Sequence, residues 1–344
     1  MQEGRVGLAG VPTILITGAA GQVGTMLRPR LARPGRTLRL LDTATLTAGP
    51  GEEVIRASIT DMAAMTAACQ DVDAVVHLAG VPTEGPWPQI LEVNIHGTYV
   101  VFEAARRAGV PRVVFASSNH AVGFAPREDF PVPDYAFPVP DTYYGVAKVA
   151  GEGLAAMYHY RYGLDAVCIR ILTCFERPPS TRALATWLSP NDAGRLFEAC
   201  LTAPSPGFRV VFGVSANTRG GWVSLDEARA LGYEPRDDAE TYAAEIIAAE
   251  GEPDPADPLL AYLAEGGNKA AAAGRAHLAR PTFYAKLKTI ERILGVSLES
   301  AESRTSLHVA LLAVLSRSAW RAGSGSGAAT PGPAGAAPGP TPPG

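Results

Sequence analysis

Tyr144 and Lys148 place a phenol and an ammonium group four residues apart, within the sequence YGVAK. On a helix this spacing puts both side chains on the same face, one turn apart. A neighbouring ammonium lowers the pKa of a phenol and donates hydrogen bonds to ligand hydroxyls, a role that a planar guanidinium fits poorly. Lys148 is also the only lysine among the first 268 residues, a region otherwise supplied with arginine. The pair therefore predicts a proton-transfer site, and the alternative is a surface lysine retained by chance.

A polar cluster follows the apolar run RVVFA, where the sequence SSNH occupies positions 117–120. Ligands of parallel α/β sheets bind at the carboxyl ends of the strands, where such a cluster would lie. Serines often end strands, so Ser118 alone would indicate only a strand end. Because Tyr144 and Lys148 follow it by 26 and 30 residues, Ser118 is predicted to be a third catalytic group.

A glycine-rich turn lies near the start of the chain. The apolar run ILIT leads into GAAGQVG at positions 18–24, and a helical pattern follows to about residue 31. Glycines in this context allow backbone N–H groups to approach a pyrophosphate at a helix N-terminus. Asp42 comes 18 residues after Gly24, where an acidic side chain binds the adenosine ribose and repels a 2′-phosphate. The pattern predicts an NAD site, and the alternative is that the glycines serve only the turn.

Short apolar runs alternate with helical patterns through the first half of the chain. This alternation predicts an α/β fold, a Rossmann-type doubly wound parallel sheet with helices on both faces. We assign it to residues 11–249 and expect the segment after residue 171 to be irregular as far as residue 233. Strands are expected at 13–17, 37–42, 74–79, 112–117 and 166–171, and a helix at 94–108.

The C-terminal third has a different composition. Residues 250–258 (EGEPDPADP) form a charged, proline-rich linker, and residues 323–344 form a Gly/Pro/Ala-rich tail that we expect to be disordered. Between them, residues 259–318 are expected to form a small all-helical unit. Residues 283, 287, 290 and 294 are apolar at helical spacing, and residues 306–315 read as a final apolar helix. The unit is basic, with nine Lys/Arg against four Asp/Glu from 259 to 321.

Composition excludes several classes of protein. The chain has 344 residues, 47% hydrophobic content and a net charge of −4, so two folded units are expected and nothing global indicates nucleic acid or a membrane. The four cysteines show no CxxC spacing and no spacing with histidine that would suggest a metal site. We therefore expect reduced cysteines and no bound metal. Because no leader pattern and no run of 18 apolar residues occurs, we expect a cytoplasmic protein.

The combination of serine, tyrosine, lysine and glycine turn resembles the extended short-chain dehydrogenase/reductase superfamily. The resemblance implies that Tyr144 accepts the substrate hydroxyl proton, that Lys148 holds the nicotinamide ribose and that Ser118 binds the reacting oxygen. Asn94 matches an asparagine that supports the lysine. The implied NAD-binding residues are Gly18, Gly21, Gln22, Val23, Gly24, Asp42, Ser58, Ile59, Leu78, Ala79, Gly80, Asn94, Lys148 and Thr173.

A narrower resemblance rests on the sequences SSNHAVG, YYGVAKVAGE, RILTCFERPPSTRALATWLSPND, VVFGVSANTRGGW and LGYEPRDDAE. Over roughly residues 13–245 these are similar to bacterial uronate dehydrogenases, which oxidise galacturonate or glucuronate with NAD. The resemblance implies that Ser118, Asn119 and His120 hold the sugar, and that Thr173 lies near the nicotinamide. Arg182 would bind the C6 carboxylate, for which a forked guanidinium is suited; stacking or surface exposure is the alternative.

Two positions depart from that family pattern. Pro82 stands where these enzymes present a serine to the substrate, and proline has neither a hydroxyl nor an N–H. Ser58 stands where an aspartate usually contacts adenine. Each loss of a hydrogen bond is worth about 1 kcal/mol, or several-fold in affinity.

The run from residue 266 to residue 312 resembles the C-terminal helix-turn-helix of PucR/CdaR-type transcription regulators. The resemblance implies that residues 280–288 face the major groove of DNA. The alternative is a helical cap or dimerisation module. The implied DNA contacts are Arg280, Thr282, Tyr284, Lys286 and Lys288.

The sequence thus favours an NAD-dependent uronate dehydrogenase that converts the anomeric hydroxyl of a hexuronate to an aldarolactone. We expect a homo-oligomer with a sugar acid as substrate and DNA as a further partner. Two alternatives stay open: a DNA-binding regulator whose dehydrogenase-like part senses NAD or a sugar acid, and a sugar-nucleotide epimerase or dehydratase.

Overall fold

The computed structural model describes residues 12–125, 130–250, 262, 268–270, 272, 280–294 and 297–300. The chain divides into two compact units, Met1–Glu252 and Pro253–Gly344, which are described separately. The predicted linker beyond Glu250, the predicted helix at 306–315 and the tail at 323–344 lie outside the described residues.

The first unit is built on a parallel sheet of seven strands in the order β3-β2-β1-β4-β5-β6-β9. The strand order reverses between β1 and β4, which is the switch point where ligands of such sheets bind. A short second sheet pairs β7 with β8. The bounds are β1 Thr13–Thr17, β2 Thr37–Asp42, β3 Glu52–Arg56, β4 Ala74–His77, β5 Arg112–Ser118, β6 Asp165–Ile171, β7 Thr173–Cys174, β8 Trp187–Leu188 and β9 Phe208–Gly213.

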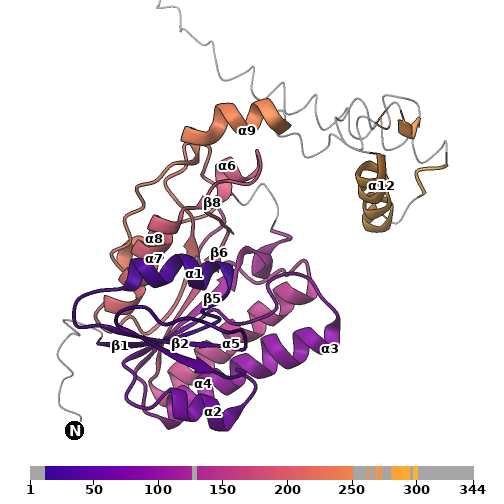
Figure 1. Ribbon diagram of the computed structural model, residues 1–344. Coiled ribbons are helices and arrows are strands. Elements are labelled where there is room, and N and C mark those ends of the chain that lie inside the picture. Colours follow the sequence, from indigo (N-terminus) through magenta and orange to yellow (C-terminus); the bar gives the residue numbers. More distant parts are fainter. Residues whose placement is uncertain are drawn as a thin grey trace, which may run out of the picture. The chain divides into compact units, whose positions relative to one another are not determined.

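Helices cover both faces of the large sheet (Figure 1). On one face, α1 (Gln22–Leu31) and α7 (Pro190–Thr202) enclose a core of aliphatic side chains with the inward residues of the strands. On the other, α2 (Met62–Ala68), α4 (Gly97–Arg107) and α5 (Tyr143–Tyr162) enclose a second core. The predicted doubly wound α/β fold is therefore confirmed.

Shorter elements connect these layers. They are α3 Trp87–Gln89, the π-helical segment η1 Ile90–His96, η2 Asn119–Val122, α6 Ala183–Thr186, α8 Asp226–Ala230, η4 Ala239–Tyr242 and α9 Ala243–Glu250. Among the described residues, no helix combines the length and apolar character needed to span a bilayer.

One expectation about the elements of this unit was wrong, and one strand was missed. The segment from residue 172 to residue 233 contains α7 and β9 rather than irregular chain. The strand β3 was not predicted at all, because it lies at the edge of the sheet and its sequence EEVIR is charged and largely exposed. Charged residues are common on edge strands, where they oppose pairing with another sheet, so they hide the usual apolar signal.

The helix expected at 94–108 is divided into two forms. Its first part belongs to the π-helical segment η1, and α4 continues from Gly97. The buried Asn94 side chain accepts a hydrogen bond from Val81 N at 2.7 Å and donates one to Val81 O at 3.0 Å. A π-helical turn re-aims side chains locally, and here one of its residues is fixed against the segment that follows β4.

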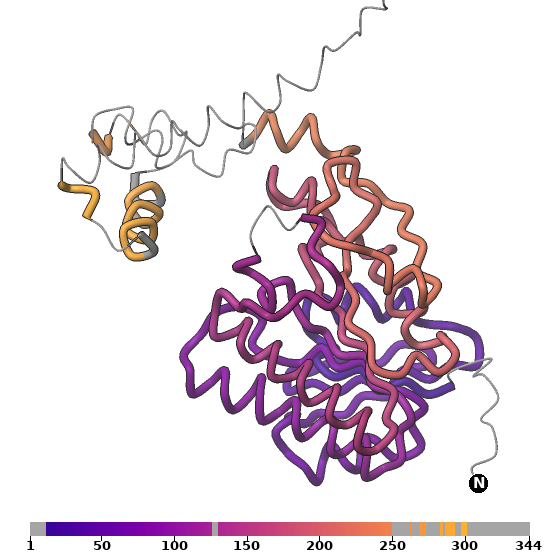
Figure 2. Tube along the Cα trace, turned by 180° about the vertical axis from the view of Figure 1, so that it is seen from behind, coloured from indigo at the N-terminus to yellow at the C-terminus, as the bar shows by residue number. Residues whose placement is uncertain are grey.

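The helix that carries Tyr144 and Lys148 is α5, which is capped at both ends. Thr142 accepts a hydrogen bond from Gly145 N at its start, and Gly163 ends it with φ of 73°. Gly151 lets the helix approach the sheet, since a Cβ there would stand 2.5 Å from the Phe115 ring. Seen from behind, α5 runs beside α4 (Figure 2). The helical placement of the Tyr144–Lys148 pair is thus as the spacing predicted.

The second unit contains α12 (Arg280–Leu294). Phe283 and Leu287 are buried in a cluster with Tyr262, Ala272 and Leu298, and the partly buried Ile290 packs against them. The apolar face predicted for this helix is therefore present at these three positions.

Candidate active site

The glycine turn between β1 and α1 is fixed by close backbone contacts. Gly18 has φ of 73° and donates a hydrogen bond from its N–H to Leu41 O at 2.9 Å. A Cβ at Gly18 would stand 2.6 Å from Ala79 N, and one at Gly24 would stand 2.4 Å from Gly18 O. At the exposed Gly21, in contrast, the nearest atom to such a Cβ is Gly18 O at 3.2 Å. The turn thus presents open backbone at the start of α1, which fits a pyrophosphate group.

Asp42 ends β2 beside this turn. Its carboxylate accepts hydrogen bonds from Ala20 N at 2.9 Å and Ala44 N at 3.0 Å, so its position is defined by the backbone. A fixed carboxylate here can accept hydrogen bonds from ribose hydroxyls and repels a 2′-phosphate. The residue therefore fits NAD.

The remaining residues expected at the cofactor surround the same edge of the sheet. Leu78 N donates to Thr17 O at 3.1 Å and Ala79 N to Thr17 Oγ1 at 3.4 Å, which extends β4 beyond its last paired residue. Ile59 is buried. The Ser58 hydroxyl is engaged locally, with Thr60 Oγ1 at 2.8 Å.

The catalytic candidates come together between β5 and α5. Lys148 Nζ is buried and donates a hydrogen bond to Ala116 O at 2.7 Å. It lies 5.2 Å from the centre of the Tyr144 ring. The Ser118 hydroxyl is close enough to the Tyr144 phenol to lower the pKa of that phenol. The phenol, the ammonium and the serine hydroxyl are therefore neighbours, as the spacing in the sequence predicted.

Burial controls the protonation of this pair. It lowers the pKa of Lys148 to about 8, and the nearby Glu152 carboxylate opposes this shift. It also raises the pKa of Tyr144, against the effect of the hydrogen bond from Ser118. The expected net lowering of the phenol pKa by Lys148 is therefore not found, because the ammonium faces the ring and desolvation of the phenolate dominates.

Asn119 and His120 lie in η2, directly after β5. His120 Nδ1 is 2.8 Å from Asp141 Oδ1, and its ring stands edge-on to the Tyr144 ring with 5.7 Å between the centres. Ser118 Oγ accepts a hydrogen bond from His120 N at 3.2 Å. Asp141 was missed by the sequence analysis, since it stands 21 residues away with no motif around it.

Arg182 precedes α6 and is exposed. Its guanidinium carbon lies 5.5 Å from the centre of the Trp222 ring. Within the described ranges its guanidinium has no ion pair and no hydrogen bond, which leaves its N–H groups available for an anionic ligand. The guanidinium of Arg182 is therefore stacked on an aromatic ring and still able to bind an anion. Trp222 was another residue that the sequence analysis missed.

Thr173 and Gln22 connect the two ends of the site. Thr173 Oγ1 is 2.8 Å from Thr186 Oγ1, and Thr173 belongs to β7. Gln22, the first residue of α1, donates a hydrogen bond from Nε2 to Cys174 O at 2.7 Å. The glycine turn is thereby joined to the segment that follows β6.

Pro82 is exposed in the segment after β4. Two residues later, Glu84 accepts a hydrogen bond from Tyr144 N at 3.2 Å. A carboxylate from the segment that carries Pro82 therefore contacts the backbone of Tyr144.

A buried ion pair next to the catalytic candidate Lys148 was also missed. Glu152 follows Lys148 by one helical turn and binds Arg170 of β6 through two hydrogen bonds of 2.9 and 2.8 Å. The spacing Tyr144, Lys148, Glu152 continues at four residues, and this was the signal that could have found it. In the part of the chain that the structure describes, no group of three or more His, Cys, Asp or Glu side chains is arranged to hold a metal ion.

The fold and this site define an oxidoreductase of the short-chain dehydrogenase type that uses NAD. Residues 14–186 match the NAD dependent epimerase/dehydratase family, and the chain belongs to that family. A uronate dehydrogenase from Pseudomonas putida is 44% identical over 258 residues, covering 74% of this chain and 94% of that protein.

Solved structures give the same relationship. A crystal structure of a mutant uronate dehydrogenase from Agrobacterium tumefaciens, complexed with NAD, is 41% identical with a TM-score of 0.69, covering 73% of this chain and 94% of the other. A glucuronic acid dehydrogenase from Chromohalobacter salexigens is 40% identical with a TM-score of 0.69, covering 78% of this chain and all of the other.

Residues 257–313 match the PucR C-terminal helix-turn-helix domain. Of the residues expected to contact DNA, Tyr284, Lys286 and Lys288 are exposed on α12. The side chains of Arg280 and Thr282 lie outside the described part.

Proposed function

We propose that the enzyme oxidises the anomeric hydroxyl of galacturonate or glucuronate to the aldarolactone, with transfer of hydride to NAD. The uronate and glucuronic acid dehydrogenases among its relatives support this substrate class. The observation that carries the proposal is Arg182, an exposed cation stacked on Trp222 without an acidic partner in the described ranges. A carboxylate matches the two parallel N–H donors of a guanidinium and accepts hydrogen bonds from both.

The chain's own residues would share the proton chemistry. NAD supplies the acceptor for the hydride that leaves C1. Tyr144, as phenolate, accepts the proton of the C1 hydroxyl, and the Ser118 hydroxyl donates a hydrogen bond to the reacting oxygen. Lys148 holds the nicotinamide ribose. The C1 hydrogen would leave with its electron pair for NAD, the Tyr144 phenolate would take the hydroxyl proton, and a carbonyl group would remain at C1.

The sugar would be held on the side of η2. Asn119 and His120 present polar atoms there, and the bond to Asp141 fixes the imidazole of His120. Arg182 would bind the carboxylate at the far end of the ring. Binding at both ends would orient C1 towards the cofactor.

The test is NAD reduction followed at 340 nm with galacturonate, glucuronate and the neutral sugars galactose and glucose. We expect turnover of one or both uronates and weak turnover of the neutral sugars. No turnover of either uronate by the intact chain would exclude the proposal.

A second function is proposed for the C-terminal unit. Its match to the PucR helix-turn-helix domain and the exposed lysines of α12 support DNA binding. DNA binding that rests on phosphate contacts weakens steeply as salt increases. We expect the intact chain to retard duplex DNA in a salt-dependent manner and a chain truncated after residue 256 to lose this property. Equal binding by both chains would contradict the assignment.

The DNA test has a matched charge control. Lys286→Ala and Lys288→Ala should each lower the slope of log affinity against log salt by about one. Lys269→Ala serves as the control, because Lys269 is already paired with Glu299. If all three variants gave the same slope of log affinity against log salt, the lysines of α12 would not contact DNA phosphates.

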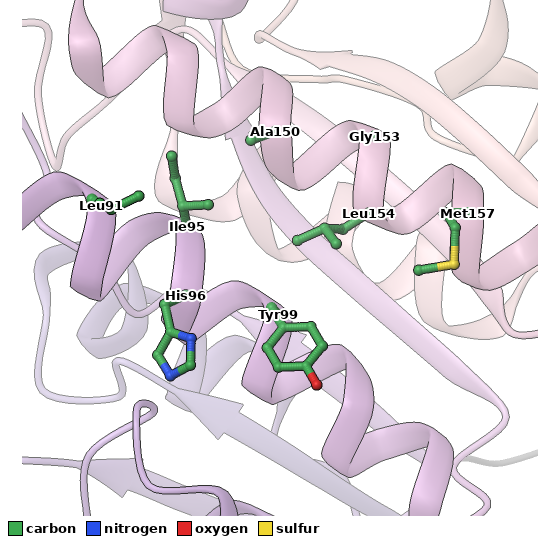
Figure 3. Close-up of a pocket in the computed structure, with 8 residues that line it drawn as sticks. All are labelled: Leu91, Ile95, His96, Tyr99, Ala150, Gly153, Leu154 and Met157. Atoms are coloured by element: carbon green, nitrogen blue, oxygen red, sulfur yellow. The ribbon is translucent and has the colours of Figure 1, made fainter.

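We also propose that the enzyme is a cytoplasmic homo-oligomer. A groove of about 580 Å³ runs between η1, α4 and α5, lined by Leu91, Ile95, His96, Tyr99, Ala150, Gly153, Leu154 and Met157 (Figure 3). A Cβ at Gly153 would meet no atom within 4 Å, so packing within the chain does not require glycine there. An apolar, glycine-containing helix face suits the two-fold packing of a second copy. The four cysteines are all free and buried, which agrees with a reducing compartment.

Sedimentation of two variants tests this assembly. Met157→Glu should shift the protein towards the monomer, because the carboxylate would be buried at the interface. Tyr160→Glu, on a highly exposed position of the same helix, should leave the mass unchanged. A monomeric wild type would contradict the proposal.

A further inference from the structure

Glu152 joins α5 to the strand that carries the catalytic serine. Its Oε1 accepts a hydrogen bond from Ser117 Oγ at 2.6 Å, and both side chains are buried. Ser117 directly follows Ala116, whose carbonyl accepts a hydrogen bond from Lys148 Nζ. Two consecutive residues of β5 therefore bind two residues of α5 that are spaced one turn apart. This pattern fixes the register of the helix on the strand.

Arg170 holds the other side of the Glu152 carboxylate. Its Nε and Nη2 bind the two carboxylate oxygens, while Nη1 donates to Asp134 O at 3.3 Å and Ala136 O at 3.5 Å. A buried ion pair of this kind contributes little net stability compared with apolar side chains of the same volume. Because Glu152 lies one helical turn from Lys148, its charge is placed to act on the charge of Lys148.

The ionisable groups at this interface come from three elements. On β4, burial and the charge of Lys148 lower the pKa of His77 to about 3, so its imidazole is neutral. On β6, burial raises the pKa of Cys168 well above its usual value, so its thiol is neutral. Among the described residues, Glu152 is thus the carboxylate that acts on the charge of Lys148.

We propose that Glu152 is a positioning residue of the active site: it fixes α5 on β5 and supplies the negative charge that accompanies the Lys148 ammonium into the core. Ser117 and Arg170 hold the carboxylate in place for this task. Only the activity measurement below rests on the proposed uronate reaction. The titration of Lys148 does not, so the two ideas can fail separately.

The lysine content of the chain makes a direct measurement possible. Lys148 is the only lysine of the first unit, and the other three, Lys269, Lys286 and Lys288, lie in the second. The full-length protein labelled with ¹³C at lysine Cε would give four signals, and Lys148→Arg assigns the buried one. Its titration midpoint reports the charge state of Lys148 without substrate or cofactor.

Glu152→Gln removes the charge and keeps the shape. We expect the Lys148 midpoint to move down by about one pH unit or more, since two charges one helical turn apart interact by a few kcal/mol at an effective dielectric constant of about 20. The pH profile of kcat with a uronate should move to lower pH in the same direction. An unchanged Lys148 midpoint would overturn the proposal.

Two further variants separate charge from packing. Glu152→Asp keeps the charge but shortens the side chain, so Tm should fall while Lys148 titrates close to the wild type. If Glu152→Gln alone does not fold, the double variant with Arg170→Gln removes the unpaired buried cation. Lys148 should still titrate below the wild-type midpoint there, because it has lost the Glu152 carboxylate that favours its ammonium form. A wild-type midpoint in the double variant would leave Glu152 a purely structural role and refute the inference.

Glu103→Gln is the matched control. Glu103 is a comparably buried glutamate that accepts hydrogen bonds from Arg106 and Arg107 of its own helix α4. The variant should lower stability without moving the Lys148 midpoint. If Glu103→Gln moved the Lys148 midpoint as far as Glu152→Gln does, the effect would come from the loss of any negative charge. A specific role for Glu152 would then be excluded.

Discussion

The guanidinium carbon of Arg182 lies 5.5 Å from the centre of the Trp222 ring, and this indole in turn lies 5.6 Å from the ring of Phe130. Arg182 stands before α6, whereas Trp222 and Phe130 belong to segments about 40 residues after it and about 50 before it. Stacking orients the plane of the guanidinium and leaves its edge N–H groups free. Three distant segments thus cooperate to hold one cation ready for an anion.

Arg182→Met should weaken uronate binding. Loss of hydrogen bonds to a charged ligand costs about 1.5–3 kcal/mol, so KM for glucuronate should rise roughly 10- to 150-fold with a smaller change in kcat. Steady-state kinetics with glucuronate and glucose checks this, because KM for the neutral sugar should not change. Arg177→Met is the control, since Arg177 also stacks on an aromatic ring but is already paired with Glu245.

Trp222→Ala should produce a weaker form of the same defect. The arginine remains, but the stacking worth about 0.5–2 kcal/mol is lost, so KM for uronates should rise about 2- to 30-fold. Trp222→Phe should lie between the wild type and the alanine variant. If Trp222→Ala matches the wild type in KM, the indole does not position Arg182.

Tyr144→Phe should abolish most turnover without abolishing cofactor binding. A positioned acid–base group contributes about 10²- to 10⁴-fold to rate, and the phenyl ring keeps the packing of the tyrosine. Stopped-flow NAD reduction and NAD binding by calorimetry measure the two effects separately. Tyr143→Phe is the neighbouring control; Tyr143 is 54% exposed and should tolerate the change. Equal losses in both variants would argue against a special role for Tyr144.

Asp42→Ala should relax the preference for NAD over NADP. The wild-type carboxylate, held by Ala20 N and Ala44 N, opposes a 2′-phosphate at a cost of several kcal/mol. We expect the ratio of kcat/KM for NAD to that for NADP to fall at least about 10-fold. A wild type that already uses both cofactors equally would remove the basis for this prediction.

His77 should make the protein less stable in mild acid. It is fully buried with a pKa of about 3, whereas an unfolded histidine titrates near 6.5. Between these values the unfolded state binds a proton that the folded state does not, so stability is present above pH 6.5 and is lost as the pH falls. This single group should lower the free energy of unfolding by about 2 kcal/mol between pH 7.5 and pH 5.

Urea denaturation at both pH values measures that change. His77→Gln should be less stable at pH 7.5, because the imidazole bonds Thr17 and Thr98, but it should lose part of the pH dependence. An equal pH dependence in the variant would assign the acid sensitivity to other groups.

The sheet was predictable where its strands are apolar and buried on both faces. The runs at β1, β2, β4, β5 and β6 carry that signal directly. The strand β3 lacks that signal, since an edge strand needs no apolar faces. The elements α7 and β9 were not recognised because they follow a segment of short elements and loops. The π-helical turns around Asn94 were equally invisible, because their apolar spacing differs little from that of an α-helix.

The site was predictable where one local motif carries the chemistry. Tyr144, Lys148 and the glycine turn follow from fixed spacings along the chain. Asp141 and Trp222 depend instead on contacts between distant segments, which no spacing encodes. The sign of the Tyr144 pKa shift also required the structure, because it depends on how far burial exceeds the effect of nearby charges.

The hydrogen bond from Gln22 Nε2 to Cys174 O crosses 152 positions of sequence. It joins the glycine turn between β1 and α1 to the strand that holds Thr173. If a dinucleotide bound at the glycine turn raises the affinity for a ligand beyond β7 through this bond, that ligand must raise the affinity for the dinucleotide by the same factor. The bond therefore offers a direct route by which the two ends of the site can influence each other's binding.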